Sequence, residues 1–344
     1  MNSSTSPRPR IFITCLPSAY DRLIGPRDAA VLESFATVDR NMQERLLSDE
    51  EMLQRTAQAD GIIVGWPGQS NALSKTLIDA AGPLRIVGQL GQSIKQIDTD
   101  AVFARGLALV NSPSAFANAV AEFTLAMMLG ARHSLHAHDR AMRMGTEAWG
   151  IKNASLLGRE LCGATVGLIG FGWIGKRVAQ LLAPFQVELL VHDPYAAMDP
   201  DTPAGVRFTS LDDLLARSDI VSAHAALTQA TAHLIGRVQL EQMKIDALLV
   251  NTARGGLVHE EALIDKLQRC PAFTAALDVF ASEPLAPDSP LRGMDNVLLS
   301  SHRSGHTVQA YEGMGTQVIE DFQRFFAGQE LRYRVTAAQL SALK

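Results

Sequence analysis

The chain has few cysteines and no long apolar run. Its 344 residues include only Cys15, Cys162 and Cys270, which are odd in number, far apart and in no C-x-x-C pair. This spacing argues against a disulfide framework and favours a reducing compartment. The apolar stretch nearest the N-terminus, residues 11–16, is stopped by Pro17, and no later stretch is long enough to span a bilayer. We therefore expect a soluble, cytoplasmic protein.

Basic residues are neither in excess nor clustered. Lys and Arg number 31 against 36 Asp and Glu, which gives a formal net charge of -5, and no Lys/Arg run occurs. A nucleic-acid-binding protein more often carries a basic face or stripe, so we expect neither a nucleic-acid partner nor a membrane partner. Hydrophobic residues make up 47% of the chain and charged residues 19%, an ordinary globular composition, and the length suffices for two packed domains.

Short apolar runs alternate with helical patterns along the chain. The runs are continuous, as in strands that are buried on both faces of a sheet. This strand–helix alternation predicts an α/β fold with doubly wound parallel sheets, and the number of runs predicts two of them. The predicted strands are residues 10–16, 61–65, 84–90, 106–111, 164–170, 187–193, 219–225, 247–253, 273–279 and 296–302.

Two helical segments are notable. Residues 114–133 are apolar nearly all round, which predicts a buried helix between the two sets of strands. A last helix is expected at about 308–327. Near the end of the first segment stand His133, His136 and His138, whose spacings do not place all three on one helix face. No carboxylate or cysteine completes a ligand set, so we expect no metal there.

The sequence TVGLIGFGWIGKRVAQLL, residues 165–182, carries the most informative motif. Gly170, Gly172 and Gly175 form G-x-G-x-x-G between a predicted strand and a predicted helix. In that context the glycines permit a tight turn, close approach of a pyrophosphate and close helix–strand packing, with the helix N-terminus facing the phosphates. The next strand ends in Asp193, which can accept hydrogen bonds from ribose hydroxyls and would repel a 2′-phosphate. The motif therefore predicts a Rossmann domain that binds NAD rather than NADP.

Polar side chains follow three successive predicted strands. Asn251 and Arg254 lie at the end of the predicted strand 247–253 or directly after it. Asp278 and Glu283 lie at or after the end of the strand 273–279, and His302 ends the strand 296–302. In an open parallel sheet, ligands bind at the carboxyl ends of the strands. Hydride transfer needs a proton donor or acceptor and a group that holds the substrate, so an arginine, a carboxylate and a histidine at these positions are candidates.

The last of these stretches, SSHRSGHT at residues 300–307, contains two histidines four residues apart. His302 and His306 could form a metal pair, one could be an acid/base, or both could be loop residues. The serine and glycine between them argue against a helical ligand pair, and no further ligand is in view, so we expect no metal. We favour an acid/base role for His302 and a structural role for His306, while Arg303 either faces solvent or touches the substrate.

These motifs, in this order and spacing, resemble the D-isomer-specific 2-hydroxyacid dehydrogenase family over nearly the whole chain. They are the glycine fingerprint with Asp193, DIVSAHAALTQAT at 219–231, NTARGGLV at 251–258, LDVFASEP at 277–284 and SHRSGHT at 301–307. The resemblance implies a Rossmann NAD-binding domain, residues 115–306, inserted into a flavodoxin-like substrate-binding domain, residues 1–114 and 307–344. It also implies a homodimer formed through the cofactor domain.

The resemblance further implies roles for individual residues. The catalytic residues would be Arg254, which binds the substrate carboxylate and carbonyl, His302, the acid/base, and Glu283, its carboxylate partner. Asp278 would lie near the nicotinamide carboxamide. The residues implied to bind NAD are Gly170, Gly172, Trp173, Ile174, Gly175, Asp193, His224, Thr231, Thr252, Ala253, Arg254, Asp278 and His302.

The stretch GQSIKQID, residues 91–98, departs from the family's usual G-x-G-x-D-x-I-D loop, whose backbone N–H groups hold the substrate carboxylate. Ser93 stands where glycine is usual and Lys95 where aspartate is usual. Backbone donation from Gln92 and Ser93 is still available. If Lys95 points inward, we hypothesise a substrate with a second acidic group, and otherwise the lysine is solvated. The expected substrate-binding residues are Gln92, Ser93, Lys95, Arg254 and His302.

The implied reaction interconverts a D-2-hydroxy acid and the 2-oxo acid by hydride transfer to or from NAD. Neutral His302 would take the hydroxyl proton during oxidation and return it during reduction. Two alternatives are an NAD(H)-sensing, corepressor-like binding protein and a phosphite-type dehydrogenase of the same fold. The sequence does not name the substrate, and the stretches expected to select it are residues 65–70, residues 91–95 and the region around Trp149.

Overall fold

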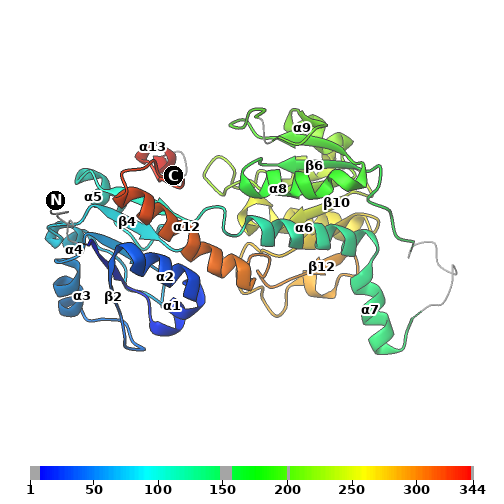
Figure 1. Ribbon diagram of the computed structural model, residues 1–344. Coiled ribbons are helices and arrows are strands. Elements are labelled where there is room, and N and C mark those ends of the chain that lie inside the picture. The colour runs from blue at the N-terminus through cyan, green and yellow to red at the C-terminus, as the bar shows by residue number, and fades with distance from the viewer. Residues whose placement is uncertain (1–7, 148–156, 200–201, 342–344) are drawn as a thin grey trace. The chain divides into compact units, whose positions relative to one another are not determined.

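The computed structural model describes residues 8–147, 157–199 and 202–341, which fold into two compact units (Figure 1). We call the described chain before Ala117 and after Gly305 the flanking unit, and the part between these boundaries the inserted unit. Binding of the substrate by the flanking unit and of the cofactor by the inserted unit stays a prediction.

Among the described residues, five parallel strands form the sheet of the flanking unit: β1 (Arg10–Ile13), β2 (Thr37–Arg40), β3 (Gly61–Val64), β4 (Ile86–Gln89) and β5 (Ala108–Asn111). Their order is β2-β1-β3-β4-β5. Strands β3, β4 and β5 are buried throughout, as their continuous apolar runs predict. The order is that of flavodoxin-like sheets, with its reversal between β1 and β3.

The helices of this unit are α1 (Pro17–Leu23), α2 (Pro26–Phe35), α3 (Asp49–Thr56), α4 (Lys75–Ala80), α5 (Thr99–Ala104), α12 (Val308–Phe326) and α13 (Ala337–Ser341). Helix α12, the predicted last helix, packs against α1, α2, β4 and β5. It lies close to the sheet because Gly88 has no side chain: a Cβ there would come within 2.7 Å of Val318 and Phe322. A helix from the C-terminal part of the chain therefore packs on a sheet formed by the N-terminal part, and the unit is discontinuous in sequence.

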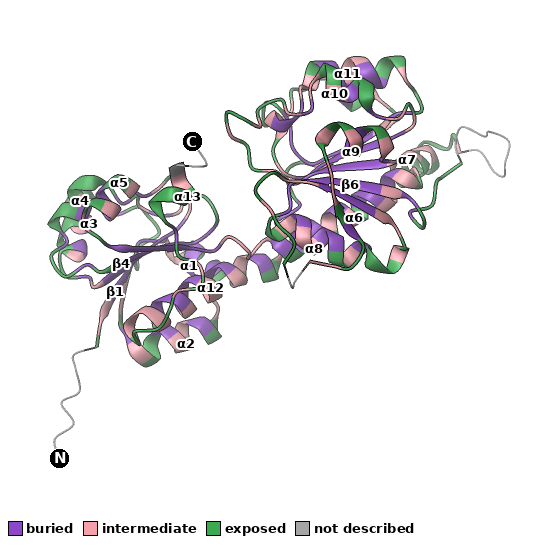
Figure 2. Ribbon diagram, turned by 90° about the horizontal axis from the view of Figure 1, so that it is seen from above, coloured by how far each residue is buried: buried purple, intermediate pink, exposed green. Residues whose placement is uncertain are grey.

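The described part of the inserted unit contains a sheet of seven parallel strands: β6 (Thr165–Ile169), β7 (Glu188–His192), β8 (Val206–Phe208), β9 (Ile220–Ala223), β10 (Leu248–Asn251), β11 (Thr274–Leu277) and β12 (Val297–Leu299). Their order is β12-β11-β10-β9-β6-β7-β8, and most of their residues are buried (Figure 2). Apart from the added edge strand β12, this is the Rossmann order. The predicted fold class, a Rossmann domain inserted into a flavodoxin-like domain, is confirmed.

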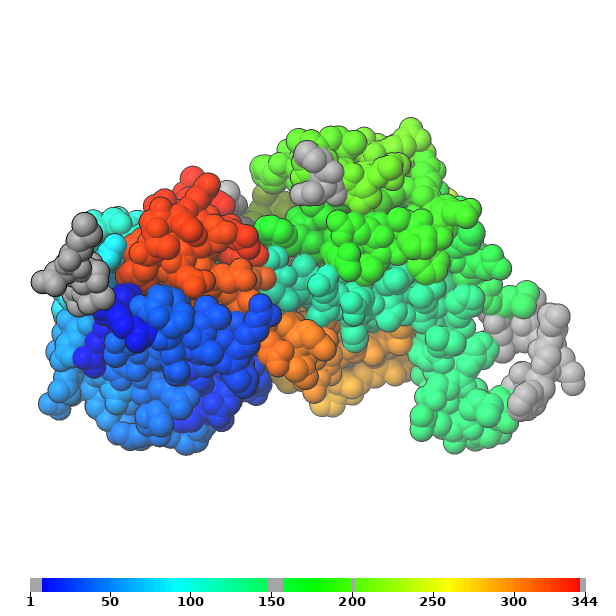
Figure 3. All heavy atoms as spheres, in the orientation of Figure 1, coloured from blue at the N-terminus to red at the C-terminus, as the bar shows by residue number. Residues whose placement is uncertain are grey.

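The helices of the inserted unit are α6 (Ala117–Arg132), α7 (Leu135–Met144), α8 (Trp173–Leu182), α9 (Leu211–Arg217), α10 (Arg237–Gln242) and α11 (Glu260–Arg269), with short 3-10 turns η2 (Ala183–Phe185), η3 (Gly255–Leu257) and η4 (Pro290–Gly293). Helix α6 packs on α8 and β10. Most of its residues are buried, as the apolar sequence predicts, while Asn118, Glu122 and Ala126 form an exposed stripe. Helix α7 has no buried residue and stands out from the unit (Figure 3).

Strands β2 and β8 were not among the predicted strands. Both lie at sheet edges, where β2 pairs with β1 and β8 pairs with β7. Their sequences, TVDR and VRF, contain charged residues, and most of their residues are only partly buried or exposed. A continuous apolar run does not mark such strands, because one edge and part of each face meet water. Pairing with an already buried strand defines them instead.

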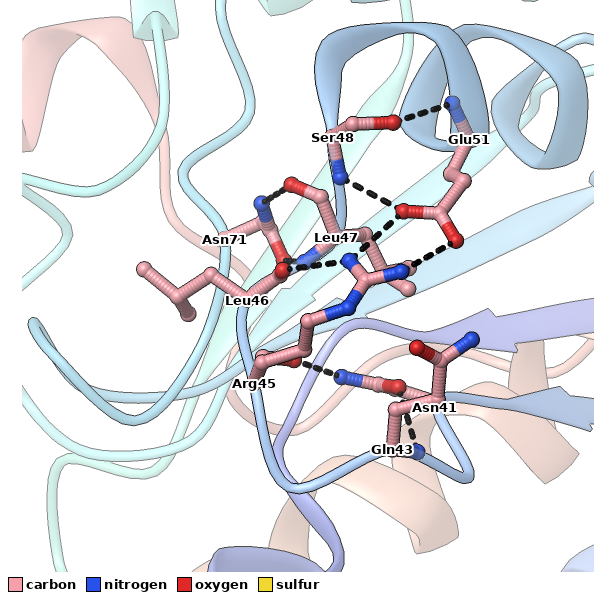
Figure 4. Close-up of polar contacts among 8 residues, drawn as sticks. All are labelled: Asn41, Gln43, Arg45, Leu46, Leu47, Ser48, Glu51 and Asn71. Atoms are coloured by element: carbon pink, nitrogen blue, oxygen red, sulfur yellow. Dashed lines mark hydrogen bonds and ion pairs between the residues drawn. The ribbon is translucent and has the colours of Figure 1, made fainter.

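Polar contacts hold the segment before α3 and reach the chain after β3 (Figure 4). The Ser48 hydroxyl accepts from the backbone N–H of Glu51, and the Glu51 carboxylate accepts from the backbone N–H of Ser48 at 2.7 Å. Arg45 donates to both oxygens of Glu51 at 2.8 Å, and these bonds, with those from Ser48, lower the pKa of Glu51 to about 2. Asn71 accepts from and donates to the backbone of Leu47 at 3.0 and 2.9 Å. The segment after β3 is therefore anchored to the start of α3.

Across the described ranges, no helix combines the length and the apolar composition that crossing a bilayer requires. Even α12, with 19 residues, includes charged side chains such as Glu312, Glu320 and Arg324.

Candidate active site

The glycine fingerprint forms the turn between β6 and α8. Gly170 has a φ of +97°, which favours glycine, and a Cβ there would lie 2.5 Å from the backbone nitrogen of Ala225. A Cβ at Gly175 would overlap the carbonyl oxygen of Gly170. Gly172 differs, because its φ of −77° is ordinary and a Cβ would meet no atom within 4 Å. The fold itself requires the first and third glycines, whereas the second borders open space that a ligand can use.

The N-terminus of α8 lies beside this space. Gly172 is its N-cap residue and supplies no side-chain hydrogen bond. Trp173 begins the helix and is 57% exposed, and Ile174 behind it is partly buried. The first N–H groups of a helix have no carbonyl partner within the helix, and the helix dipole favours an anion there. These residues fit the pyrophosphate of a dinucleotide.

Asp193, directly after β7, holds the glycine turn against this strand. One carboxylate oxygen accepts from the backbone N–H of Phe171 at 2.7 Å, and the other from Tyr195 and Ala196 at 2.9 and 3.2 Å. Among the described residues, no lysine or arginine forms an ion pair with it. The oxygen that accepts only from Phe171 can accept a further hydrogen bond, so the arrangement is compatible with a ribose hydroxyl. Ribose binding by Asp193 is still a prediction.

His224, directly after β9, is partly buried and has one buried nitrogen without a partner in the described chain. Its Nε2 lies 2.9 Å from the Ser222 hydroxyl, and burial lowers its pKa to about 4, so the ring is neutral at neutral pH. Its Nδ1 has no hydrogen-bond partner within the described chain. Buried polar atoms are normally satisfied, so this nitrogen fits a ligand contact at the carboxyl end of β9. Thr231 instead donates its hydroxyl to the carbonyl of Ala226 at 2.6 Å, and its contact with the cofactor stays a prediction.

The loop after β10 is fixed by side-chain hydrogen bonds. Asn251 accepts from the backbone N–H of Ala253 at 3.1 Å and donates to the carbonyl of Arg254 at 2.9 Å. The hydroxyl of Thr252 is buried and lies 2.7 Å from that of Thr124 on α6. Ala253 and Thr252, both expected at the cofactor, are thus held rigidly at the carboxyl edge of the sheet.

The side chain of Arg254 projects from this fixed loop. A Cβ at the next residue, Gly255, would overlap the carbonyl group of Phe280, so the loop lies directly against the chain that follows β11. The Arg254 guanidinium is exposed and donates to the carbonyl of Ala253 at 2.6 Å. It pairs with no carboxylate in the part of the chain that the structure describes. It is therefore available to an anionic ligand.

His302 and Glu283 form a hydrogen-bonded pair. Nδ1 of His302 lies 2.7 Å from Oε2 of Glu283, and Oε1 of Glu283 accepts from the backbone N–H of Phe280 at 3.1 Å. The two side chains are 46% and 37% exposed. The other ring nitrogen, Nε2, has no hydrogen-bond partner among the described residues. The pair can therefore take up or release a proton at a nitrogen that is open to a ligand.

Asp278 holds the turn that presents His302. The turn is unusual because His302 has a φ of +55°, a left-handed conformation that is rare for a residue with a side chain. The Asp278 carboxylate accepts from the backbone N–H groups of Arg303 and Ser304 at 2.8 and 3.0 Å. Burial alone raises its pKa, but these bonds and one with Ser300 lower the pKa overall. Asp278 is fully buried, and its contact with the carboxamide stays a prediction.

A cavity of about 710 Å³ opens beside the His302–Glu283 pair, entirely within the inserted unit. It is lined by Phe280, Glu283, Pro284, Leu285, Arg292, Leu299, Ser300, Ser301 and His302. Arg292 in its wall donates to the carbonyl groups of Ala286 and Leu285 at 2.8 and 2.7 Å. The His302–Glu283 pair is therefore accessible from a largely apolar hollow.

Gln92, Ser93 and Lys95 belong to the flanking unit, unlike the other predicted site residues. They lie in the loop after β4, and all three are exposed. The loop begins at Gly91, whose N–H donates to the Ser112 hydroxyl at 2.7 Å and whose carbonyl accepts from the Ser112 N–H at 3.2 Å. The backbone N–H groups of Gln92 and Ser93 meet no acceptor, and Lys95 meets no carboxylate, among the described residues.

The two histidines of SSHRSGHT have different partners. His302 bonds to Glu283, whereas His306, in the flanking unit, has its Nδ1 2.9 Å from the hydroxyl of Tyr311. Across the described ranges, no group of three or more His, Cys, Asp or Glu side chains could hold a metal ion. The side chain of Arg303 is exposed. Trp149, a candidate for substrate selection, lies outside the described residues.

Several residues that hold the site in place were missed from the sequence. They are Thr124, which bonds to Thr252, Ser112, which fixes Gly91, and Ser222, which orients His224. Each is a hydroxyl residue in or directly after an apolar run. That pattern is a usable signal, because a buried hydroxyl needs a hydrogen-bond partner.

Residues 125–304 match the family described as D-isomer specific 2-hydroxyacid dehydrogenase, NAD binding domain. The chain belongs to this family. The matched segment contains the glycine turn, Asp193, Arg254, Glu283 and His302. The predicted resemblance is confirmed, and NAD is the cofactor, as the glycine fingerprint predicts.

Individual relatives carry different activities in their names. D-3-phosphoglycerate dehydrogenase of Mycobacterium bovis is 37% identical over 280 residues, which cover 81% of this chain and 52% of that protein. Glyoxylate reductase of Aeropyrum pernix is 33% identical over 325 residues, 93% of this chain and 94% of that protein. The crystal structure of a glyoxylate reductase from Paecilomyes thermophila has a TM-score of 0.77 and 26% identity, covering 97% of this chain and 100% of that one. The chain spans about half the length of the phosphoglycerate dehydrogenases that it matches.

Proposed function

We propose that the protein is an NAD-dependent oxidoreductase that interconverts a D-2-hydroxy acid and the corresponding 2-oxo acid. The observation that carries the proposal is the 2.7 Å contact between His302 Nδ1 and Glu283 Oε2, with Nε2 left open, at the carboxyl edge of the NAD-binding sheet. NAD, when bound, supplies the hydride acceptor for oxidation and, as NADH, the donor for reduction. Binding the acid and moving the proton fall to the protein's own side chains.

His302 is the acid/base in this proposal. With its Nδ1–H directed to Glu283, the neutral ring has a lone pair on Nε2 that can accept the proton of the 2-hydroxyl group. In the reductive direction the protonated ring donates from Nε2 to the 2-oxo oxygen. Glu283 orients the ring through its hydrogen bond to Nδ1. The backbone N–H of Phe280 fixes the carboxylate in turn.

Arg254, in the inserted unit, is the residue that we assign to the substrate carboxylate. Arg254 has a guanidinium without an acidic partner among the described residues, and it can bind a carboxylate with paired hydrogen bonds. Gln92 and Ser93 offer backbone N–H groups without acceptors. Lys95 is the basis for a finer hypothesis, a substrate with a second acidic group. If Lys95→Ala leaves the preference between mono- and dicarboxylic substrates unchanged, that hypothesis fails.

The proposal is tested by following NADH oxidation with a panel of 2-oxo acids: glyoxylate, pyruvate, aryl- and branched pyruvates, and oxaloacetate. We expect turnover of at least one, and a loss of about 100-fold or more in kcat for His302→Asn with the Kd for NADH unchanged. NADH binding without turnover of any 2-oxo acid would favour the sensing alternative. NAD reduction by phosphite in its place would favour the phosphite-type dehydrogenase.

Glu283→Gln is the matched variant for the acid/base pair. Glutamine keeps an oxygen for the Phe280 N–H but replaces the charged acceptor of the His302 Nδ1–H by a neutral one. We expect kcat for 2-oxo acid reduction to fall, because a hydrogen bond to a neutral amide holds the ring less firmly than one to a carboxylate. An unchanged kcat would contradict a role of the carboxylate in positioning His302.

We also propose a homodimer formed through the inserted unit. Helix α7 supports this, because none of its residues is buried and Leu135, Met142 and Met144 are 59%, 55% and 69% exposed. Apolar side chains on a projecting helix are typical of an association surface. Light scattering should give twice the chain mass for the wild type and a lower mass for a Met142→Lys/Met144→Lys double variant. A monomeric wild type would rule the proposal out.

A further inference from the structure

We propose that Trp66 donates its indole N–H to the substrate carboxylate, alongside the backbone N–H groups of Gln92 and Ser93. The inference rests on the proposed function and adds a residue to it. Trp66 follows β3 in the flanking unit, and its Nε1 lies against the start of the loop after β4. A Cβ at Gly91, where the φ is +109°, would be 2.7 Å from this nitrogen.

The backbone of the loop directs two N–H groups to the same side. The carbonyl of Gly91 accepts from the N–H of Ser112 at 3.2 Å, and the carbonyl of Gln92 accepts from the side chain of Asn111 at 2.9 Å. In a trans peptide the C=O and N–H bonds point in opposite directions. The N–H groups of Gln92 and Ser93, which share these two peptides, therefore point away from the end of β5. Consecutive backbone N–H groups without acceptors form an anion-binding concavity.

The indole N–H of Trp66 is a third donor at this place. The ring is partly buried, and Nε1 meets no hydrogen-bond acceptor within the described chain. Nε1 is not itself a buried atom, so its N–H is open to a ligand. The contact with Gly91 places this N–H beside the two backbone N–H groups of the loop. A carboxylate fits, because its two oxygens can accept several hydrogen bonds at once.

The aromatic neighbours of Trp66 hold the ring in this position. Phe116 stacks on it with a centroid distance of 6.4 Å and an interplanar angle of 19°, and Tyr311 of α12 lies 5.1 Å away at 59°. Tyr311 is itself held, since its hydroxyl lies 2.9 Å from Nδ1 of His306 and the guanidinium of Arg22 lies 5.7 Å from its ring. The donor is therefore preorganised, so little conformational entropy is lost when an anion binds.

Trp66→Phe is the direct test, because it removes the N–H and keeps an aromatic ring against Phe116 and Tyr311. Oxalate, a carboxylate that cannot be reduced by hydride transfer, is the probe, titrated into the enzyme–NADH complex by calorimetry. We expect the Kd for oxalate and the KM of the best 2-oxo acid to rise by roughly 10- to 100-fold, as for one lost hydrogen bond to a charged group. The Kd for NADH should not change. Unchanged Kd and KM values for the acid would overturn the inference.

Two controls separate hydrogen bonding from scaffolding. Phe116→Leu removes the stacking partner but leaves the N–H, so oxalate binding should weaken only a few-fold. In Trp66→Phe, KM should rise less for the methyl ester of the best substrate than for the acid, because hydrogen bonds to neutral acceptors are weaker. An equal rise in KM for the acid and the ester would mean that Trp66 only supports the shape of the site and donates no hydrogen bond to the carboxylate.

The outcome for Trp66 is independent of the outcome for the proposed function. Oxalate binding is measured without turnover, so it tests Trp66 even if no 2-oxo acid is reduced. An active wild type with normal oxalate binding in Trp66→Phe would reject this inference alone. A wild type that reduces no 2-oxo acid would reject the proposed function whatever Trp66 does.

Discussion

The backbone N–H of His302 donates to the backbone carbonyl of Asp278 at 2.7 Å, and the Asp278 carboxylate accepts the next two backbone N–H groups of the chain. This clasp joins the end of β11 to the chain after β12. It keeps His302 in its left-handed conformation, which is strained for a residue with a Cβ. Glu283 then needs only to orient a ring whose backbone is already in place.

Asp278→Asn should loosen the clasp. The amide keeps one oxygen, and its NH₂ group cannot accept, so one of the N–H groups of Arg303 and Ser304 loses its partner, at about 1–3 kcal/mol. We expect a lower urea midpoint and a lower kcat at pH 7. Because the folded-state pKa of Asp278 is lowered, its contribution is full above the ordinary value near 3.8 and is lost as the pH falls below it. Urea titrations of both proteins at several pH values measure this, and equal midpoints at pH 7 would contradict it.

Gly172→Ala and Gly175→Ala should separate ligand binding from folding. At Gly172 the φ is ordinary and the space is open, so the alanine variant should keep the wild-type melting temperature and lose NADH affinity by about 10-fold or more. At Gly175 the new methyl group would overlap the carbonyl of Gly170. That variant should lose stability by roughly 1–3 kcal/mol, the usual range for an overpacked site. Calorimetry with and without NADH distinguishes the two, and the same loss of stability in both variants would count against an open cofactor site.

Asp193→Asn should narrow the preference for NADH over NADPH. Removing the charge reduces repulsion of a 2′-phosphate. The amide oxygen can still accept from the Phe171 N–H, whereas the N–H groups of Tyr195 and Ala196 lose their acceptor. We expect the ratio of kcat/KM values for the two cofactors to fall by about 10-fold, the scale of a change near 1.4 kcal/mol. The ratio is measured with one fixed 2-oxo acid. A ratio equal to that of the wild type would show that Asp193 acts only on the turn.

His224 should make stability depend on pH. Its folded-state pKa is about 4, against an ordinary 6.5 for histidine, so the unfolded chain binds a proton more readily than the folded chain in this window. Stability should therefore fall as the pH drops from about 6.5 toward 4. His224→Asn should show a shallower fall of the urea midpoint between pH 7 and pH 5. Parallel curves for the two proteins would mean that other groups control this range.

Local patterns were enough to predict ten of the twelve strands in the described residues, including every central one, because a strand buried on both faces must be continuously apolar. They were also enough for the glycine turn, where the tight backbone at Gly170 and Gly175 excludes side chains. The same patterns missed β2 and β8, which are defined by pairing at a sheet edge. They predicted the buried helix α6 but not the exposed stripe of Asn118, Glu122 and Ala126 along it.

The positions of Arg254, Glu283 and His302 at strand ends follow from the sequence alone, because parallel strands bring their carboxyl ends to one edge. Only the tertiary structure decided how those residues are held: Asp278 clasps the His302 turn, and Gly255 lets the Arg254 loop lie against Phe280. It also brought Trp66 to Gly91, 25 positions later in the chain. Such contacts depend on packing between segments far apart in sequence, and no local period or spacing encodes them.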